Sequence, residues 1–260
     1  MSNCNTAILL SAGMARRLYP LTTEKPKNLI KIHGTKTILD YQLEALDRSG
    51  VIEKVYIVVG FQHKKVKEYI KPNIYSFSID FILNPFFEVS NNIVSVWLAL
   101  KEIKGPLITI NGDDVFSENI IKRIANTQEE VVLSISKSSV NYDDDDMKVI
   151  LSENNDRLLE IGKHLDVKET QAESIGIIKY TKKGTELFLE AYDCLLEDDH
   201  ANIGIFYLSV IQKMISIGNE ISVLEFGENE WREFDFPEDI ELFKNDLTDS
   251  ILEGEVFQEN

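Results

Sequence analysis

The chain is poor in cysteine and in positive charge, and both shortages restrict its function. Its 260 residues include two cysteines, Cys4 and Cys194, so we expect no disulfide framework and a reducing, cytoplasmic compartment. Lysine and arginine number 27 against 44 aspartates and glutamates, which gives a formal net charge of -17. Because nucleic-acid binding normally needs a basic face, this balance argues against a nucleic-acid partner.

Long apolar runs and histidine patterns for metal binding are also missing. No stretch approaches the roughly 20 apolar residues of a membrane span, and the N-terminus lacks a basic segment followed by a long apolar one. We therefore expect a soluble, unexported protein with no membrane partner. The four histidines share no ligand spacing, which argues against a zinc site. Hydrophobic residues make up 43% of the chain, enough for one large domain around a substantial core.

Short apolar runs alternate with amphipathic stretches through the first half of the chain, a pattern typical of a mostly parallel sheet crossed by helices. The predicted strands of this half are Thr6 to Leu10, Lys54 to Val59, Asp80 to Leu83 and Pro106 to Ile110. Its predicted helices are Ile38 to Ser49, His63 to Ile70 and Ile93 to Ile103, the last capped by Asn91-Asn92.

The second half adds shorter strands that predict a small β-rich insertion. Its predicted strands are Glu130 to Lys137, Ser174 to Tyr180, Ile221 to Phe226 and a hairpin of Met147 to Leu151 with Leu158 to Lys163. Predicted helices are Gly184 to Leu196, Ile203 to Ile217 and Pro237 to Leu247. The sequence therefore predicts one α/β domain with a smaller insertion.

The first strand runs into a turn of small residues followed by two cations, which is the outline of a phosphate site. Small residues let the main chain approach an anion closely, so its N–H groups can bind a phosphate, and we assign that role to Ser11, Ala12 and Gly13. Arg17 and Lys27 would neutralise the charge. Ordinary connections between a strand and a helix also use small residues. This turn alone therefore favours neither a purely structural role nor phosphate binding.

The rest of that segment resembles a family signature. Arg17-Leu18, Pro20-Leu21-Thr22 and Pro26-Lys27 are similar to the signature of nucleotidyltransferases, which join a nucleotide to a sugar phosphate or a similar small acceptor. The resemblance implies that Arg17 and Lys27 bind phosphates and steady charge at the reacting centre. It also implies a nucleotide site made of Leu10, Ser11, Ala12, Gly13, Met14, Arg17, Lys27 and Asn91. Ala15 and Arg16 depart from the signature, which commonly has glycine and then serine or threonine there.

Further segments resemble the branch that contains phosphocholine and phosphonate cytidylyltransferases, and the similarity runs over nearly the whole chain. These segments are Asn84-Pro85-Phe86-Phe87, Ser90-Asn91-Asn92-Ile93, Asp145 to Val149, Glu160 to Lys163, Glu173 to Ile177 and Glu233 to Asp239. The resemblance implies a Rossmann-like nucleotidyltransferase fold and CTP as the nucleotide. It divides the single domain into a mainly nucleotide-binding part (1–130), a mainly acceptor-binding part (131–235) and a C-terminal helix with an acidic tail (236–260).

Two aspartates are the predicted magnesium ligands. Mg²⁺ binds one or two carboxylates and completes its shell with water and phosphate oxygens. Asp113 follows a predicted strand, at the edge of the sheet where ligands bind. Both Asp113 and Asp235 resemble the aspartates that bind the metal in the family. Taken alone, Asp235 would more simply cap the helix that starts at Pro237. The run from Asp143 to Asp146 is interpreted as a solvated loop, because adjacent like charges stay apart.

A zwitterionic acceptor would need lysines for its phosphate and carboxylates or aromatic faces for a cationic head. The candidate acceptor-binding residues are Lys148, Lys163, Glu173, Gly176, Tyr180, Trp231 and Glu233. For each lysine, an exposed structural role carries equal weight. Trp97 falls on an apolar helix face and is assigned to the core. Ser90 and Asn91 are candidate contacts to the base or the acceptor, although Asn91 also suits a helix cap.

The leading hypothesis is an enzyme with Lys27, Arg17, Asp113 and Asp235 as catalytic residues. We expect a Mg²⁺-dependent cytidylyltransferase that joins CMP to phosphocholine, 2-aminoethylphosphonate or a similar acceptor and releases pyrophosphate for cell-surface or phosphonate pathways. A sugar-1-phosphate nucleotidyltransferase that uses UTP, dTTP or CTP stays open, as does a non-catalytic nucleotide-binding module. Either a monomer or a homodimer is compatible with the sequence. A dinucleotide-dependent oxidoreductase is disfavoured, since Ala15 and Leu18 replace the glycines that such a fold needs.

Overall fold

The computed structural model describes residues 4–71, 74–137 and 142–245. Its larger strands are β1 (Thr6–Ser11), β4 (Lys54–Val59), β5 (Ser78–Leu83), β6 (Leu107–Asn111), β8 (Val131–Ser136), β9 (Lys148–Leu151), β10 (Leu158–Gly162), β11 (Ala172–Tyr180) and β12 (Ser222–Phe226). Four short strands are β2 (Lys31–His33), β3 (Lys36–Thr37), β7 (Asp114–Phe116) and β13 (Trp231–Glu233). The helices are α1 (Ile38–Ser49), α2 (His63–Tyr69), α3 (Asn92–Glu102), α4 (Glu118–Ala125), α5 (Lys182–Asp198), α6 (Leu208–Ser216) and α7 (Pro237–Asn245).

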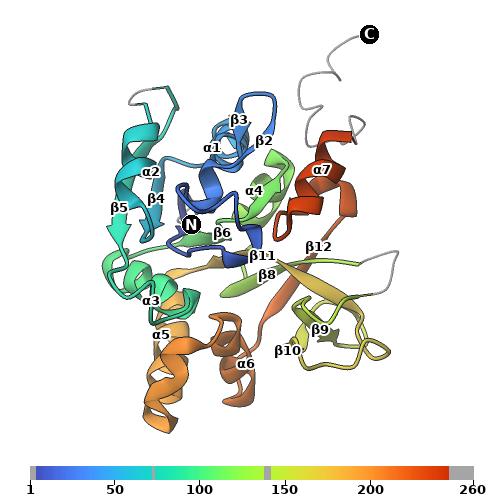
Figure 1. Ribbon diagram of the computed structural model, residues 1–260. Coiled ribbons are helices and arrows are strands. Elements are labelled where there is room, and N and C mark those ends of the chain that lie inside the picture. The colour runs from blue at the N-terminus through green and yellow to red at the C-terminus, as the bar shows by residue number, and fades with distance from the viewer. Residues whose placement is uncertain (1–3, 72–73, 138–141, 246–260) are drawn as a thin grey trace.

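A nine-stranded mixed sheet forms the centre of the molecule, with helices on both faces (Figure 1). Its strand order is β10-β9-β11-β6-β1-β4-β5, and β8 pairs with β11 and β12. The pairs of β1 with β4 and β6 are parallel, whereas β11 pairs antiparallel with β6, β8 and β9. This arrangement confirms the predicted α/β, Rossmann-like class with a β-rich insertion.

The central strand β1 is buried on both faces, which fixes the position of the loop that follows it. Ile8 and Leu10 pack with α3, α5 and α6, while Ala7 and Leu9 pack with α1, α2 and α4. A parallel strand covered on both faces reads as a continuous apolar run, and β1 fits that rule. The small-residue turn therefore emerges from a strand that is packed on both faces.

A second, two-stranded sheet brings distant acidic residues together. Strand β13 pairs antiparallel with β7 and places Glu233 opposite Asp114. The N–H of Phe234 also donates to the Asp113 carbonyl oxygen at 3.1 Å. Three-residue strands carry too little periodicity to be recognised, and the sequence analysis assigned no element to β7 or β13. It also missed the amphipathic helix α4 and the β2 and β3 strands.

The helix before β12 starts later than predicted. The sequence pattern begins it at Ile203, but α6 begins at Leu208 and a short 3-10 turn spans His200–Gly204. The Ile203 carbonyl oxygen accepts from the Asn91 N–H, and the Tyr207 N–H donates to Asn92 Oδ1. These backbone groups therefore bind the start of α3 instead of continuing a helix.

The remaining predicted elements agree with the structure to within about two residues, except that the predicted end of the last helix at Leu247 and the acidic tail lie outside the described residues. None of the helices in the described ranges is long and apolar enough to cross a membrane. The cytoplasmic location, the division of the domain and the oligomeric state stay predictions.

Candidate active site

A cavity of about 400 Å³ opens at the carboxyl ends of β1 and β6. It is lined by the loop after β1, by the residues after β6, by the start of α3 and by the acidic loop before β9. The end of β10, the segment before α6 and the residues from β13 to α7 complete it. Segments from both halves of the chain therefore face one space.

Main chain and small residues form the side of this cavity that lies next to β1. Of the predicted nucleotide-binding residues, the structure places these at the cavity: Leu10, Ser11, Ala12, Gly13, Arg17, Lys27 and Asn91. Met14 is not among the lining residues. A Cβ at Gly112 would lie 2.2 Å from the Leu10 carbonyl oxygen, so only glycine permits this close approach of two strand ends.

The loop after β1 carries both unusual backbone and unpaired polar atoms. Ala15 has a φ of 45°, in the left-handed region that favours glycine, which accounts for the glycine common in the signature at that position. Ser11 Oγ is buried and has no hydrogen-bond partner within the described residues. The side-chain amide of Asn28, which also lines the cavity, is likewise buried without a hydrogen-bond partner among the described residues. These groups are available to a polar ligand.

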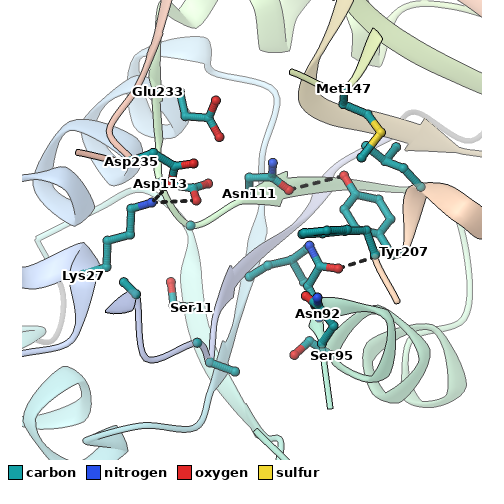
Figure 2. A pocket seen from close by; sticks show the side chains of 18 of the residues that line it. Ser11, Lys27, Asn92, Ser95, Asn111, Asp113, Met147, Tyr207, Glu233 and Asp235 are labelled. Carbon is teal, nitrogen blue, oxygen red and sulfur yellow. Dashed lines mark hydrogen bonds and ion pairs between the residues drawn. The ribbon is translucent and has the colours of Figure 1, made fainter. Parts of the chain in front are cut away.

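Lys27 lies between the two aspartates that the sequence nominated. Its Nζ donates to Asp113 Oδ2 at 2.8 Å and to Asp235 Oδ1 at 2.5 Å, as Figure 2 shows. Burial lowers the pKa of the Lys27 ammonium, but the nearby Asp113 and Asp235 carboxylates raise it by more, to above its ordinary range. Lys27 is therefore a fixed cation at neutral pH.

The ion pairs continue from Asp235 to the acidic loop before β9 and to the end of β10. Arg17 Nη1 donates to Asp235 Oδ2 at 2.7 Å, and the Arg17 guanidinium also binds the Asp145 carboxylate. Lys163 Nζ donates to Asp145 Oδ1 at 2.6 Å. Alternating charges thus form one chain across the cavity, which we call the ion-pair chain: Asp113, Lys27, Asp235, Arg17, Asp145 and Lys163.

This geometry answers two questions left by the sequence. The Asp235 carboxylate binds Lys27 and Arg17. Before the last helix it is the Asp239 carboxylate that accepts from backbone N–H groups, those of Asp235 and Phe236. The solvated-loop interpretation is wrong for Asp145, whose carboxylate lines the cavity and binds two cations. Burial opposes its ionisation, but Lys163 and Arg17 lower the pKa of Asp145 below its ordinary value.

Acidic oxygens also converge beside Lys27. Carboxylate oxygens of Asp113, Asp114 and Glu233 lie within 4.8 Å of one another. Asp113 Oδ1 and Asp114 Oδ2 are buried without a hydrogen-bond partner among the described residues. Burial, followed by the charge of Asp113, raises the pKa of the Asp114 carboxyl. An all-oxygen set with unpaired buried atoms fits a hard divalent cation such as Mg²⁺.

The structure brings three of the predicted acceptor residues to the cavity and leaves four away from it. Lys163, Glu173 and Glu233 line the cavity. Lys148 is 1% exposed, and its Nζ donates instead to backbone carbonyls of the acidic loop, including that of Asp143 at 2.9 Å. The side chain of a strand-end lysine has turned back onto its own loop.

The other three predicted acceptor residues are not among the residues that line the cavity, for packing reasons. Tyr180 is fully buried and packs edge-on against Phe188 in the core. Trp231 packs against the core cluster under α1 and α4. Gly176 has a φ of 70° and supports the cavity from behind, since a Cβ there would lie 2.2 Å from Asn111 Nδ2. The structure therefore supplies none of the aromatic faces that the sequence nominated.

Known proteins match both the sequence and the fold. Residues 6–145, more than half of the chain, match the nucleotidyl transferase family. The chain belongs to that family. A CTP:phosphoglutamine cytidylyltransferase of Campylobacter jejuni is 29% identical to this nucleotidyltransferase over 257 residues, which cover 91% of this chain and 98% of that one.

Two solved structures share the fold of this nucleotidyltransferase. The inositol-1-phosphate CTP transferase from T. maritima has a TM-score of 0.77 at 24% identity and covers 97% of this chain and 98% of its own. The CTP:phosphocholine cytidylyltransferase from Streptococcus pneumoniae has a TM-score of 0.74 at 20% identity, and the match covers 94% of this chain and 99% of that one. These likenesses in fold extend over both halves of the chain.

Sequence reasoning on this nucleotidyltransferase missed several cavity residues. Asn111 and Tyr207 meet at the back of the cavity, where the Tyr207 hydroxyl donates to Asn111 Oδ1 at 3.4 Å (Figure 2). Asn111 could have been found, because it directly precedes Gly112 and Asp113 at a strand end. Tyr207 and Phe206 follow a 3-10 turn, at positions that the sequence pattern had placed inside a helix. Asn91 lines the cavity but also caps α3, so both of its predicted roles are compatible with the structure.

Proposed function

We propose that this nucleotidyltransferase transfers CMP from CTP to a small phosphorylated acceptor and releases pyrophosphate, with Mg²⁺ as the cofactor. The observation that carries the proposal is the position of Lys27 and Arg17. They lie where the loop after β1, the two aspartates and the acceptor side meet. The relative from Campylobacter jejuni, similar over almost its full length, supports CTP as the nucleotide.

On the nucleotide side, the main chain from Ser11 to Gly13 binds the triphosphate, with Lys27 and Arg17 neutralising its charge. An acceptor oxygen bonds to the α-phosphorus while the bond from that phosphorus to the bridging oxygen of the β-phosphate breaks. Two anions must approach each other in this step, so fixed cations lower its barrier. Because an acceptor phosphate or phosphonate already carries a negative oxygen near neutral pH, no general base is required.

Asp113 and Asp235 are the proposed Mg²⁺ ligands, with Asp114 and Glu233 adding oxygens beside them. When bound, Mg²⁺ neutralises phosphate charge and helps to orient the triphosphate. The converging oxygens of Asp113, Asp114 and Glu233 and the unpaired oxygens of Asp113 and Asp114 support a cation at Asp113. Asp235 is assigned from the family resemblance, and its oxygens bind Lys27 and Arg17 in this structure. Lys163 holds the acceptor phosphate from the opposite side, and Glu173 faces the same space. We propose phosphocholine, 2-aminoethylphosphonate or a related phosphorylated amine or amino acid as the acceptor, within a cytoplasmic cell-surface or phosphonate pathway.

A panel of nucleoside triphosphates and acceptors, read out as pyrophosphate release, tests the proposal. CTP with Mg²⁺ and one of phosphocholine, phosphoethanolamine, 2-aminoethylphosphonate or a phosphorylated amino acid should release pyrophosphate, and Asp113→Asn should abolish the release in a folded protein. Turnover of UTP or dTTP with a sugar 1-phosphate would identify the alternative enzyme. Nucleotide binding without turnover of any acceptor would contradict the catalytic proposal and favour a binding module.

A further inference from the structure

The acidic loop before β9 reaches into the cavity through one side chain, Asp145. Its carboxylate binds the Arg17 guanidinium through both oxygens, and Arg17 Nη2 lies 3.2 Å from Asp145 Oδ1. Oδ1 also accepts from Lys163 Nζ at 2.6 Å. Arg17 comes from the loop after β1 and Lys163 follows β10, so one carboxylate joins the nucleotide side to the acceptor side.

The loop is built to hold that carboxylate in place. The buried Lys148 ammonium donates to the backbone carbonyls of Asp143, Asp144 and Asp146, at 2.9, 3.3 and 3.4 Å. The Asp143 N–H donates to Asp146 Oδ2 at 2.7 Å. Asp144 is exposed, whereas Asp145 is partly covered and faces the cavity. These contacts fix the backbone on both sides of Asp145 and turn its side chain inward.

Arg17 and Lys163, the two partners of Asp145, each have a second contact besides Asp145. Arg17 also donates to Asp235, whose other oxygen accepts from Lys27. The Lys163 ammonium lies 4.6 Å above the Phe206 ring. Without a shared anion, two neighbouring cations repel each other and regain side-chain freedom, so the carboxylate sets both their spacing and their orientation.

We propose that Asp145 is a positioning residue that holds Arg17 and Lys163 at the spacing needed for the triphosphate and the acceptor phosphate to meet. The proposal rests on the proposed function, because it assigns the two cations to the two substrates. Asp145 acts through these cations and need not touch either substrate. An opposite role is a competing anion that substrate phosphates must displace, and the two roles change substrate binding in opposite directions.

The test compares Asp145→Asn with Asp144→Asn, a matched change at the neighbouring exposed position, in the pyrophosphate assay with CTP, Mg²⁺ and the best acceptor. Asp145→Asn should raise the KM for the acceptor about ten-fold, because Lys163 loses its negatively charged partner. The KM for CTP should rise by less, because Arg17 keeps its ion pair with Asp235. Asp144→Asn should change neither constant, and Asp145→Glu should recover part of the affinity. The thermal midpoint of Asp145→Asn should stay near that of Asp144→Asn.

A double-mutant cycle with Lys163→Met tests the pathway of the effect. If Asp145 acts through Lys163, adding Asp145→Asn to Lys163→Met should raise the acceptor KM by much less than ten-fold. An unchanged or lower acceptor KM in Asp145→Asn, or full additivity in the cycle, would overturn the positioning role. Absence of turnover in the wild-type protein overturns the proposed function and this inference together, whereas wild-type turnover with an unaffected Asp145→Asn overturns this inference alone.

Discussion

The proposed nucleotide side and the proposed acceptor side of the cavity are built by different means. On the nucleotide side, the ends of parallel strands and small residues form the surface, with Gly112 packed closely against Leu10, and the strand behind it is buried on both faces. On the acceptor side, side chains from an antiparallel hairpin and a loop form it, and Lys163 and Asp145 are held by ion pairs. The first side therefore depends on backbone geometry and the second on the identity of its side chains, so substitutions should affect the two sides differently.

Replacing one lysine on the nucleotide side should have the largest effect on activity. Lys27→Met removes the cation between Asp113 and Asp235, and we expect kcat/KM to fall by about 10² to 10³ because charge at the reacting centre is no longer stabilised. Lys25→Met, two residues away at an exposed position, is the control and should stay near wild type. Equal activity of the two variants in the pyrophosphate assay would show that Lys27 does not stabilise charge at the reacting centre.

The buried lysine on the acceptor side should instead affect stability. Lys148→Met removes three hydrogen bonds to loop carbonyls, and we expect the free energy of unfolding to fall by about 3 kcal/mol. Urea unfolding measures this, with the exposed Lys168→Met as control. If Lys148→Met kept its stability and lost acceptor affinity alone, Lys148 would belong to the acceptor site after all.

A glycine behind the cavity supports both sides. Gly176→Ala would place a Cβ 2.2 Å from Asn111 Nδ2 and 2.6 Å from Asp114 Oδ2, at a φ of 70°. We expect a loss of about 2 kcal/mol in unfolding free energy, together with lower activity because both neighbours border the reacting centre. Gly204→Ala, which has open space around the added Cβ, serves as the control. If Gly176→Ala were as stable as this control, Asn111 and Asp114 would be able to shift away from the added Cβ at little cost.

The smallest expected effect is a pH dependence that comes from Glu173. Burial, and then the negative charge of Asp146, Glu228 and Asp143, raises the pKa of Glu173 from 4.5 to about 7. The folded state holds this proton more tightly than the unfolded chain, so the stabilisation is complete below pH 4.5 and is lost as the pH rises to about 7.

Glu173→Gln should therefore flatten the pH dependence of the unfolding free energy between pH 4.5 and 7, by an amount of order 1 kcal/mol. Urea unfolding at several pH values measures it, and the exposed Glu169→Gln should keep the wild-type slope. The same slope in both variants would mean that Glu173 titrates as an ordinary surface carboxyl.

The difference between the two sides also explains what the sequence could predict. The loop after β1 was identifiable because a short apolar strand, small residues and fixed cations stand next to one another in the chain. Lys27 and Asp113 followed from a family signature and a strand end, and the structure places both at the cavity. Most helices and larger strands were predictable because their apolar periodicity reflects burial on one or both faces.

The acceptor side depends on which way each side chain faces, and a strand buried on both faces gives no such signal. Tyr180 and Lys148 occupy strands beside the cavity, yet one packs in the core and the other binds its own loop. Asp145 looked like one of four equivalent acids until Lys163 and Arg17 were placed beside it. Its role depends on contacts between distant segments, which local composition does not encode.

The most direct test of this account measures the Mg²⁺ dependence of pyrophosphate release from CTP in the wild type, in Asp235→Asn and in Glu238→Gln, an exposed control in the first turn of α7. Asp235 joins Lys27 to Arg17, so the account predicts that Asp235→Asn loses at least about 10²-fold in kcat and requires more Mg²⁺. Glu238→Gln should keep the wild-type Mg²⁺ dependence. Wild-type release without Mg²⁺, or an Asp235→Asn variant with wild-type kcat and Mg²⁺ requirement, would contradict it.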